Sequence, residues 1–145
     1  METPATYDDV TLILKLYELR RDDKLREARD WFRKFQANTM PELEALAPQG
    51  SQNNAYFRMV TSYWEMVASF VTSGVLNQEL FLQSGGELLF VWEKIRDLVP
   101  GLRKAFQNQR YLHNMERVAN AAIETMNREN PKAYEAFSNR VRGLR

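Results

Sequence analysis

Helix-breaking residues are rare in this chain, and their positions limit the possible folds more than any other feature. The 145 residues include only six glycines and five prolines, which leave long uninterrupted stretches such as 51–73 and 102–130. Stretches of this length suit helices, because strands usually run about 3–10 residues. The Asn-Gly and Asp-Gly pairs of tight β-hairpins do not occur in the sequence. The breakers therefore predict an all-α fold of about six to eight helices.

The spacing of apolar residues supports helices and identifies a central one. Over residues 52–73, aromatic and aliphatic side chains recur at the three- and four-residue spacing of one helical face. They are Tyr56, Phe57, Val60, Tyr63, Trp64, Val67, Phe70 and Val71. Because this face covers about half of the circumference, the helix needs neighbours on more than one side. We therefore expect an aromatic-rich central helix in one bundle over residues 1–145, with a flexible start at 1–6 and a loop at 47–52.

Polar residues near the breakers predict where the other helices begin and end. Asp, Asn, Ser and Thr satisfy free N–H groups at helix amino ends, and a Glu three residues later completes a capping box. The predicted caps are Asp8 or Asp9, Asp22 or Asp23, Thr39 with Glu42, Asn77, and Asn130 before Pro131. Pro100 is expected to stop the helix that follows Gly86. Residues 102–126 are expected to form one helix, or two joined near residues 108–114.

Composition excludes several classes of functional site. The chain has no cysteine, which rules out disulfides, thiolate catalysis and cysteine-based zinc sites. His113 is the only histidine, so the histidine pairs of common metal sites are absent as well. The sequence suggests no reaction, and we expect no catalytic residue, no metal ligand and no cofactor.

Charge and hydropathy give no general attraction to a particular partner. The formal net charge of +1 does not favour nucleic acid or anionic membranes. The amino-terminal stretch "METPATYDDV" lacks the basic and apolar segments of a secretory signal. No apolar run approaches the ~18 residues of a membrane span. We therefore expect a cytoplasmic protein with no membrane span and no nucleic-acid partner.

The glycine pair in "FLQSGGELLFVWEKI" raises the question of a phosphate-binding loop. Such loops need a lysine directly after the glycines, or a G-x-G-x-x-G spacing after a strand, and neither is found around Gly85 and Gly86. Ser84 and Glu87 have the spacing of a capping box, and the glycines permit a left-handed end to the preceding helix. The stretch therefore predicts a joint between two helices.

Three residues outside the glycine pair are candidates for a pocket or an interface. Tyr63 and Trp64 lie on the broad apolar face of residues 52–73, where aromatic side chains form core more often than a ligand pocket. His113 shares a helix face with Glu116, but one histidine and one carboxylate make an incomplete metal site. A surface or interface position is expected for His113.

A fourth candidate, Phe90, lies away from the apolar stripe of its helix. At 100° per residue it points about 140° from the centre of that stripe, towards Glu93 and Asp97. The stripe consists of Leu88, Val91, Trp92, Ile95 and Val99. A phenylalanine on a polar face needs cover, either from the neighbouring segment with Phe81 and Leu82 or from a second subunit or partner. We favour the cover by the neighbouring segment.

A basic run over residues 20–34 offers a second kind of surface. Seven cations could bind phosphate backbones: Arg20, Arg21, Lys24, Arg26, Arg29, Arg33 and Lys34. Acidic residues are interleaved with them throughout the run, at Asp22, Asp23, Glu27 and Asp30. This alternation favours a solvated, ion-paired helix surface.

Four stretches resemble a bacterial family of helical proteins, the domain of unknown function 4760. They are "LYELRRDDKLREARDWF", "YFRMVTSYWEMVASFVTSGVLNQEL", "LLFVWEKIRDLVPGLR" and "RYLHNMERVANAA". The resemblance spans roughly residues 10 to 125. It implies a helical fold and carries neither a catalytic signature nor an established activity.

The sequence thus favours a non-enzymatic helical module that binds a protein partner or associates with itself as a homodimer. One alternative is a small-molecule sensor with an apolar aromatic pocket around Tyr63 and Trp64, favoured by a cavity of about 300 Å³ or more. Another is a nucleic-acid-associated protein that uses the basic run over residues 20–34.

Overall fold

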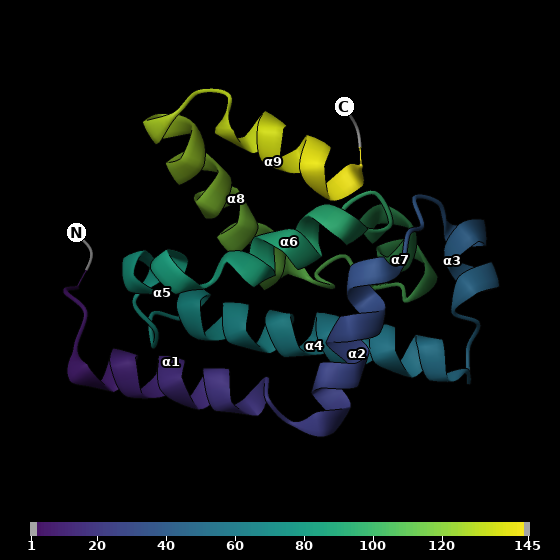
Figure 1. The fold of residues 1–145 in the computed structure, drawn as a ribbon, viewed down its shortest axis with the longest axis horizontal. Coiled ribbons are helices and arrows are strands. Elements are labelled where there is room, and N and C mark those ends of the chain that lie inside the picture. Colours follow the sequence, from purple (N-terminus) through teal and green to yellow (C-terminus); the bar gives the residue numbers. More distant parts are fainter. Residues whose placement is uncertain (1–2, 144–145) are drawn as a thin grey trace.

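The computed structural model describes residues 3–143, which form nine α-helices and no strand (Figure 1). The helices are α1 (Tyr7–Leu19), α2 (Asp23–Lys34), α3 (Met40–Leu46), α4 (Gln52–Thr72), α5 (Gln78–Ser84), α6 (Gly86–Ile95), α7 (Val99–Ala105), α8 (His113–Glu129) and α9 (Ala133–Arg142). The all-α prediction is confirmed, with one helix more than the upper expectation. Residues 1–2 of the expected flexible start lie outside the described residues.

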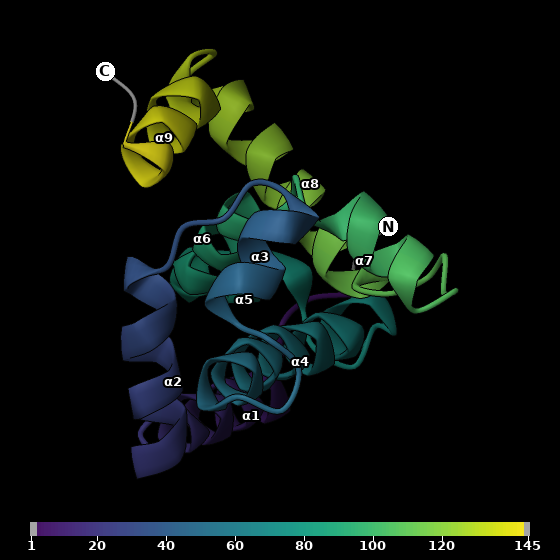
Figure 2. The same cartoon turned by 90° about the vertical axis from the view of Figure 1, so that its right-hand side faces the viewer.

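Helix α4 is the centre of the fold, as its apolar pattern predicts. It contacts α2, α5, α6 and α8, while α1 runs along it and α2 crosses it (Figures 1 and 2). Eight of its residues are buried: Phe57, Val60, Thr61, Tyr63, Trp64, Val67, Ala68 and Val71. The hydroxyl of Thr61, the one non-aromatic polar side chain among them, donates to the carbonyl of Phe57 at 2.9 Å. This wide buried face explains why α4 has neighbours on several sides.

Aromatic rings join α2 to α4. Trp31 stacks on Phe35 with ring centroids 5.1 Å apart, and Phe35 meets the edge of Phe57 at 5.8 Å. Phe32 lies 4.9 Å from Phe35 and is almost fully buried. Stacked and edge-to-face pairs add specific geometry to the apolar burial, so α2 is fixed firmly across α4.

Three of the predicted caps form. Asp22 accepts from the backbone N–H groups of Lys24 and Leu25, Thr39 from that of Glu42, and Asn77 from that of Leu80. The cap of α1 was predicted wrongly, because Thr6 rather than Asp8 or Asp9 precedes the helix. Asp9 instead completes the capping box by accepting from the Thr6 backbone N–H at 2.7 Å.

The region between α6 and α8 differs from the prediction in two ways. Helix α6 ends at Ile95, and Pro100 lies in the first turn of α7 instead of stopping the helix before it. This position suits proline, whose missing N–H needs no partner there. The stretch from residue 102 holds two helices, separated by a joint that ends at Leu112 with a left-handed φ of 59°. Helix α9 begins at Ala133, two residues after Pro131.

Glu65 of α4 caps the amino end of α8 in place of a local residue. Its carboxylate accepts from the Met115 backbone N–H at 2.8 Å and from the Asn114 side chain at 3.0 Å. Asn114 also accepts from the Thr72 hydroxyl at 2.7 Å. Glu65 and Thr72 of α4 therefore hold the amino end of α8 in place.

The glycine pair forms a joint between helices, as predicted, but for a different reason. Helix α5 ends at Ser84 and α6 begins at Gly86, and neither glycine has a positive φ. Ser84 makes no cap, because Gly85 occupies the N-cap position without a side-chain hydrogen bond. A Cβ atom at Gly85 would lie 2.5 Å from the Phe81 ring, whereas one at Gly86 would meet open space. Close packing of Phe81 therefore requires glycine at residue 85.

Candidate functional site

A cavity of about 330 Å³ lies between α1, α4 and α5. Helix α1 and its C-cap residue Arg20 line one side of it. Four of these residues are spaced by three and four and share one face: Ile13, Leu16, Tyr17 and Arg20, with Leu14 beside them. Helix α4 contributes Tyr63, Trp64 and Val67, and α5 contributes Phe81. The walls are mainly apolar and aromatic, which is the usual lining of a small-molecule site.

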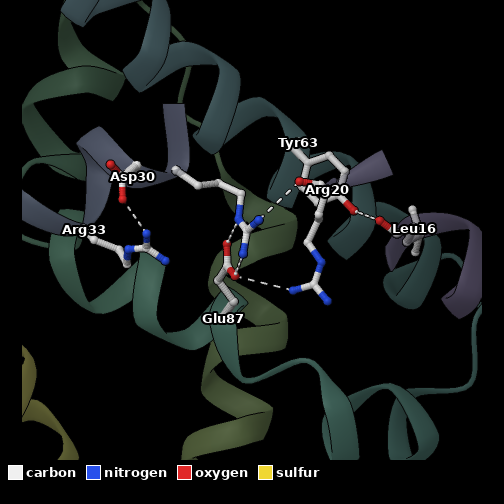
Figure 3. Close-up of polar contacts among 7 residues, drawn as sticks. Leu16, Arg20, Asp30, Arg33, Tyr63 and Glu87 are labelled. Atoms are coloured by element: carbon white, nitrogen blue, oxygen red, sulfur yellow. Dashed lines mark hydrogen bonds and ion pairs between the residues drawn. The ribbon is translucent and has the colours of Figure 1, made fainter. Parts of the chain in front are cut away.

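Tyr63 and Trp64 come together at this cavity, but their polar atoms differ. The Tyr63 hydroxyl donates to the Leu16 carbonyl at 2.5 Å (Figure 3). Burial raises the pKa of Tyr63 to about 12, so the hydroxyl keeps its proton at neutral pH. The Trp64 indole N–H is buried and finds no acceptor among the described residues. Such an unpaired donor costs about 1–3 kcal/mol, and it is uncommon in folded proteins.

A cluster of two arginines around Glu87 reaches the cavity through Arg20, whereas Arg29 and Glu87 line a neighbouring cavity. Arg29 binds both carboxylate oxygens of Glu87, at 2.8 Å through Nε and at 2.7 Å through a terminal nitrogen. The hydrogen bond with Glu87 raises the pKa of Arg29. Arg20 makes a single longer contact of 3.4 Å with the same carboxylate (Figure 3). Arg29 thus satisfies Glu87, and Arg20 is held more weakly.

Arg20 is the cation that lines the cavity. Its guanidinium lies 5.0 Å from the ring centroid of Tyr17 and 5.5 Å from that of Trp64, both cation–π distances. Within residues 3–143, Glu87 is its only ion-pair partner. The cavity therefore has an apolar body and one partly satisfied positive charge at its wall.

Glu93 of α6 forms a separate polar centre under α9. It is 1% exposed and accepts hydrogen bonds from the Tyr134 hydroxyl, from Ser138 at 2.6 Å and from Arg142 at 2.9 Å. Burial would raise the pKa of Glu93, but these hydrogen bonds lower it overall below its ordinary value. The sequence placed Glu93 on a polar face of its helix. That prediction is wrong for Glu93, because its side chain is buried under α9.

Phe90 is half-buried and borders a second cavity of about 320 Å³. Arg29 and Phe32 of α2 also line this cavity, and the Phe81 ring packs on Gly85. The Lys94 amine lies 5.6 Å from the centre of the Phe90 ring. Phe90 is therefore only partly covered within the described chain, and its cover by the segment with Phe81 and Leu82 stays a prediction.

Lys94 is a half-buried cation beside aromatic rings. Its amine donates to the Arg33 carbonyl at 2.8 Å and lies 5.1 Å from the centre of the Phe35 ring. Burial lowers the pKa of Lys94 to about 8. The carbonyl belongs to the last turn of α2, where a positive charge is favourable.

His113 stands apart from the other candidates. It is the first residue of α8, half-buried, and it does not line the cavity with Tyr63 and Trp64. Its sequence neighbour Glu116 binds Arg103 at 2.9 Å. Between Thr3 and Gly143 the structure holds no group of three or more residues suited to a metal ion.

Sequence reasoning missed the cluster around Glu87. The pattern assigned Glu87 to a helix cap and placed Arg20 and Arg29 on a solvated surface. These contacts join residues 67 and 58 positions apart, so no local pattern reveals them. The ion-paired reading of the basic run holds for Arg33 as well, which binds Asp30 at 2.5 Å.

Comparison with known families gives one match. The model of a domain of unknown function, DUF4760, matches residues 5–122, which include α1 to α7 and the first part of α8. The chain belongs to this family. Neither the curated proteins nor the solved structures gave a match. In the described part of this DUF4760 chain, no helix combines the length and the apolar character that crossing a bilayer requires.

Proposed function

We propose that this DUF4760 protein is a non-enzymatic interaction module that associates with itself through the outer face of α1. Four large apolar side chains are exposed along that face: Tyr7 (85%), Val10 (42%), Leu14 (59%) and Tyr17 (54%). Scattered exposed apolar residues are normal, but a contiguous stripe at helical spacing is typical of an interaction surface. This stripe is the observation that carries the proposal.

The spacing of the stripe favours a second copy of the chain as the occupant. The intervals between its residues are three, four and three, so the stripe reads the same from either end. An antiparallel pair of α1 helices related by a two-fold axis would place Tyr7 against Tyr17 of the second copy. Val10 would then face Leu14 of that copy. Self-complementary surfaces of this kind are the usual basis of two-fold dimers.

The stripe is small, and this sets the expected strength of the association. A typical stable interface buries roughly 800 Å² per partner, from about 20–30 residues on each side. One helix face with four large side chains offers less. We therefore expect a weak dimer that forms reversibly as the protein concentration rises.

Sedimentation velocity over a range of concentrations tests this proposal. The native chain should shift from monomer towards dimer as its concentration rises, and Val10→Asp should abolish the shift. Val75→Asp is the matched control, because Val75 is 67% exposed but lies in the loop after α4. A native chain that stays monomeric up to millimolar concentration, or an equal effect of both variants, would contradict self-association through α1.

A bacterial origin and a cytoplasmic location belong to this proposal as expectations from the sequence. Cell fractionation followed by detection of the chain tests the location. The cavity between α1, α4 and α5 supports a second function, the binding of a small molecule, because it combines an apolar lining with the unpaired Trp64 N–H.

A further inference from the structure

We propose that the cavity between α1, α4 and α5 binds a small monocarboxylic acid with an apolar body. Its volume of about 330 Å³ is near the lower end of the roughly 300–1,000 Å³ range of ligand sites. Apolar side chains from three helices form its walls, including Ile13, Val67 and Phe81. A cavity of this size and lining takes a compact chain or ring and excludes large polar ligands.

The Trp64 indole N–H provides the first reason for an oxygen-bearing ligand. Trp64 is 3% exposed, and its N–H has no acceptor in the described part of the chain. Buried donors are nearly always paired with protein, ordered water or ligand. An acceptor oxygen on a ligand in the cavity would satisfy this N–H and recover most of the cost of its burial.

Arg20 provides the reason for a charged oxygen. Its guanidinium offers five N–H donors, of which only one makes a contact with Glu87, at 3.4 Å. Arg29 already binds both Glu87 oxygens at shorter distances, so Arg20 can turn to a ligand without leaving Glu87 unpaired. A carboxylate matches the planar guanidinium and forms strong, charge-assisted hydrogen bonds with it.

The charge of the surroundings favours one negative charge over two. Glu87 lies beside Arg20 and would repel a phosphate dianion more strongly than a carboxylate. Arg20 also packs on the Tyr17 and Trp64 rings, which restricts the space at the guanidinium. A medium-chain fatty acid or an aryl-alkanoic acid combines a single carboxylate with a body of suitable size.

Two variants separate the proposed ligand site from the association through α1. The two surfaces share Leu14 and Tyr17, but Val10 does not line the cavity and Trp64 is only 3% exposed. Val10→Asp should therefore leave ligand binding unchanged, and Trp64→Phe should leave the dimer unchanged. Failure of one proposal can be told from failure of the other.

Isothermal titration calorimetry of the 145-residue chain with octanoate tests the site. Phenylpropionate compares a ring with the alkyl chain of octanoate, and octanol is the uncharged analogue. Both acids, or one of them, should bind saturably at one site per chain, and octanol at least tenfold more weakly. Trp64→Phe, which removes the N–H but keeps an aromatic ring, should weaken acid binding about tenfold. Arg20→Met should weaken it by at least as much.

Two variants control for indirect effects. Trp92→Phe makes the same change on α6, away from the cavity, and should bind like the native chain. Ile13→Trp should fill the cavity from α1 and abolish binding while thermal melting confirms the fold. The Ile13→Trp variant tests whether the cavity is the binding site even if Trp64→Phe does not fold. The proposal is overturned if neither acid binds saturably, if octanol binds as tightly as octanoate, or if Ile13→Trp binds normally.

Discussion

Helices α4 and α9 show two different ways of holding a helix in place. Helix α4 has eight buried residues and contacts α2, α5, α6 and α8 closely. Helix α9, which lies wholly in the described part of the chain, contributes no buried residue and contacts only α6 and α8 closely. Ser138 and Arg142 of α9 donate hydrogen bonds to the buried carboxylate of Glu93. Apolar burial is insensitive to pH, whereas attachment to a carboxylate depends on its charge.

The difference also follows the boundary of the family match. The residues matched by the family, 5–122, include all of α4 and Glu93, whereas α9 lies beyond them. Among residues 3–143, the side-chain donors to Glu93 are Tyr134, Ser138 and Arg142, and all of them lie outside the matched region. Helix α9 is held by these polar contacts as well as by the packing of Phe137 on the core, and four predictions compare it with α4.

The largest effect is expected in the core. Phe57 is 3% exposed and lies against the rings of Phe32 and Phe35. Phe57→Ala should lower the free energy of unfolding by about 3–5 kcal/mol, because it removes buried area and leaves a cavity. Thermal and urea denaturation measure the loss. Phe106→Ala is the control and should change stability little, because Phe106 is more than half exposed. Equal losses of unfolding free energy in the two variants would show that the buried face of α4 does not stabilise the protein more than an exposed ring does.

A smaller and local effect is expected when Glu93 is removed. Glu93→Ala leaves Arg142 and its neighbours on α9 without their buried acceptor, which we expect to cost about 1.5–3 kcal/mol. The donors can return to water if α9 separates from α6, so the loss should be confined to that contact. Hydrogen exchange should show lost protection over residues 133–142 and unchanged protection over α4. An exposed carboxylate on α8, removed in Glu124→Ala, should change neither region. Global loss of protection would refute local attachment.

Acid should reproduce part of this effect without a mutation. The folded chain holds the pKa of Glu93 below its ordinary value of 4.5, so the attachment of α9 is at full strength above that value. It is lost as the pH falls through the lower pKa of the folded chain. Exchange over α9 should therefore rise only at a pH below 4.5 while α4 stays protected. The same titration of Glu93→Gln should lack this pH-dependent step, and a step of equal size in that variant would assign it to other carboxylates.

The smallest effect is expected at the rim of the same contact. Asp97 binds Arg142 at 2.8 Å, but its side chain is 46% exposed. Exposed ion pairs contribute about 0.2–1 kcal/mol, and salt screens them. Asp97→Asn should change the unfolding free energy by less than about 1 kcal/mol, and less in high salt, as measured by urea denaturation. A loss as large as that of Glu93→Ala would show that burial of the carboxylate is not what matters.

Local patterns predicted the fold better than they predicted the polar contacts. The caps at Asp22, Thr39 and Asn77 depend on residues two or three positions away, and the pattern around them is sufficient. Periodicity likewise identified α4, because the number and spacing of its apolar residues determine which face is buried. These features are encoded within one turn or one helix.

Contacts between distant segments could not be predicted in this way. Glu93 lies on the polar side of α6, and only the arrival of α9, 41 to 49 residues later, makes that side a buried contact. Tyr63 and Trp64 were identified as candidates, but Arg20 joins them only because α1 runs along α4. A single sequence does not reveal which polar residues pair with each other. Glu87 could have paired with Ser84 in its own turn or with Arg29 on α2, and the structure has the second pair.

The cap that Glu65 supplies to α8 affects the order in which the chain folds. The Leu112 side chain carries no oxygen that could cap α8, so the N–H groups of Asn114 and Met115 depend on a carboxylate 49 to 50 residues earlier in the chain. A contact over that separation forms slowly, because a long loop must close first. Helix α8 should therefore gain its amino end only after α4 exists, and an isolated peptide of residues 113–129 should be frayed at its start. We therefore expect α8, in the carboxyl-terminal part of this bundle, to fold after α4.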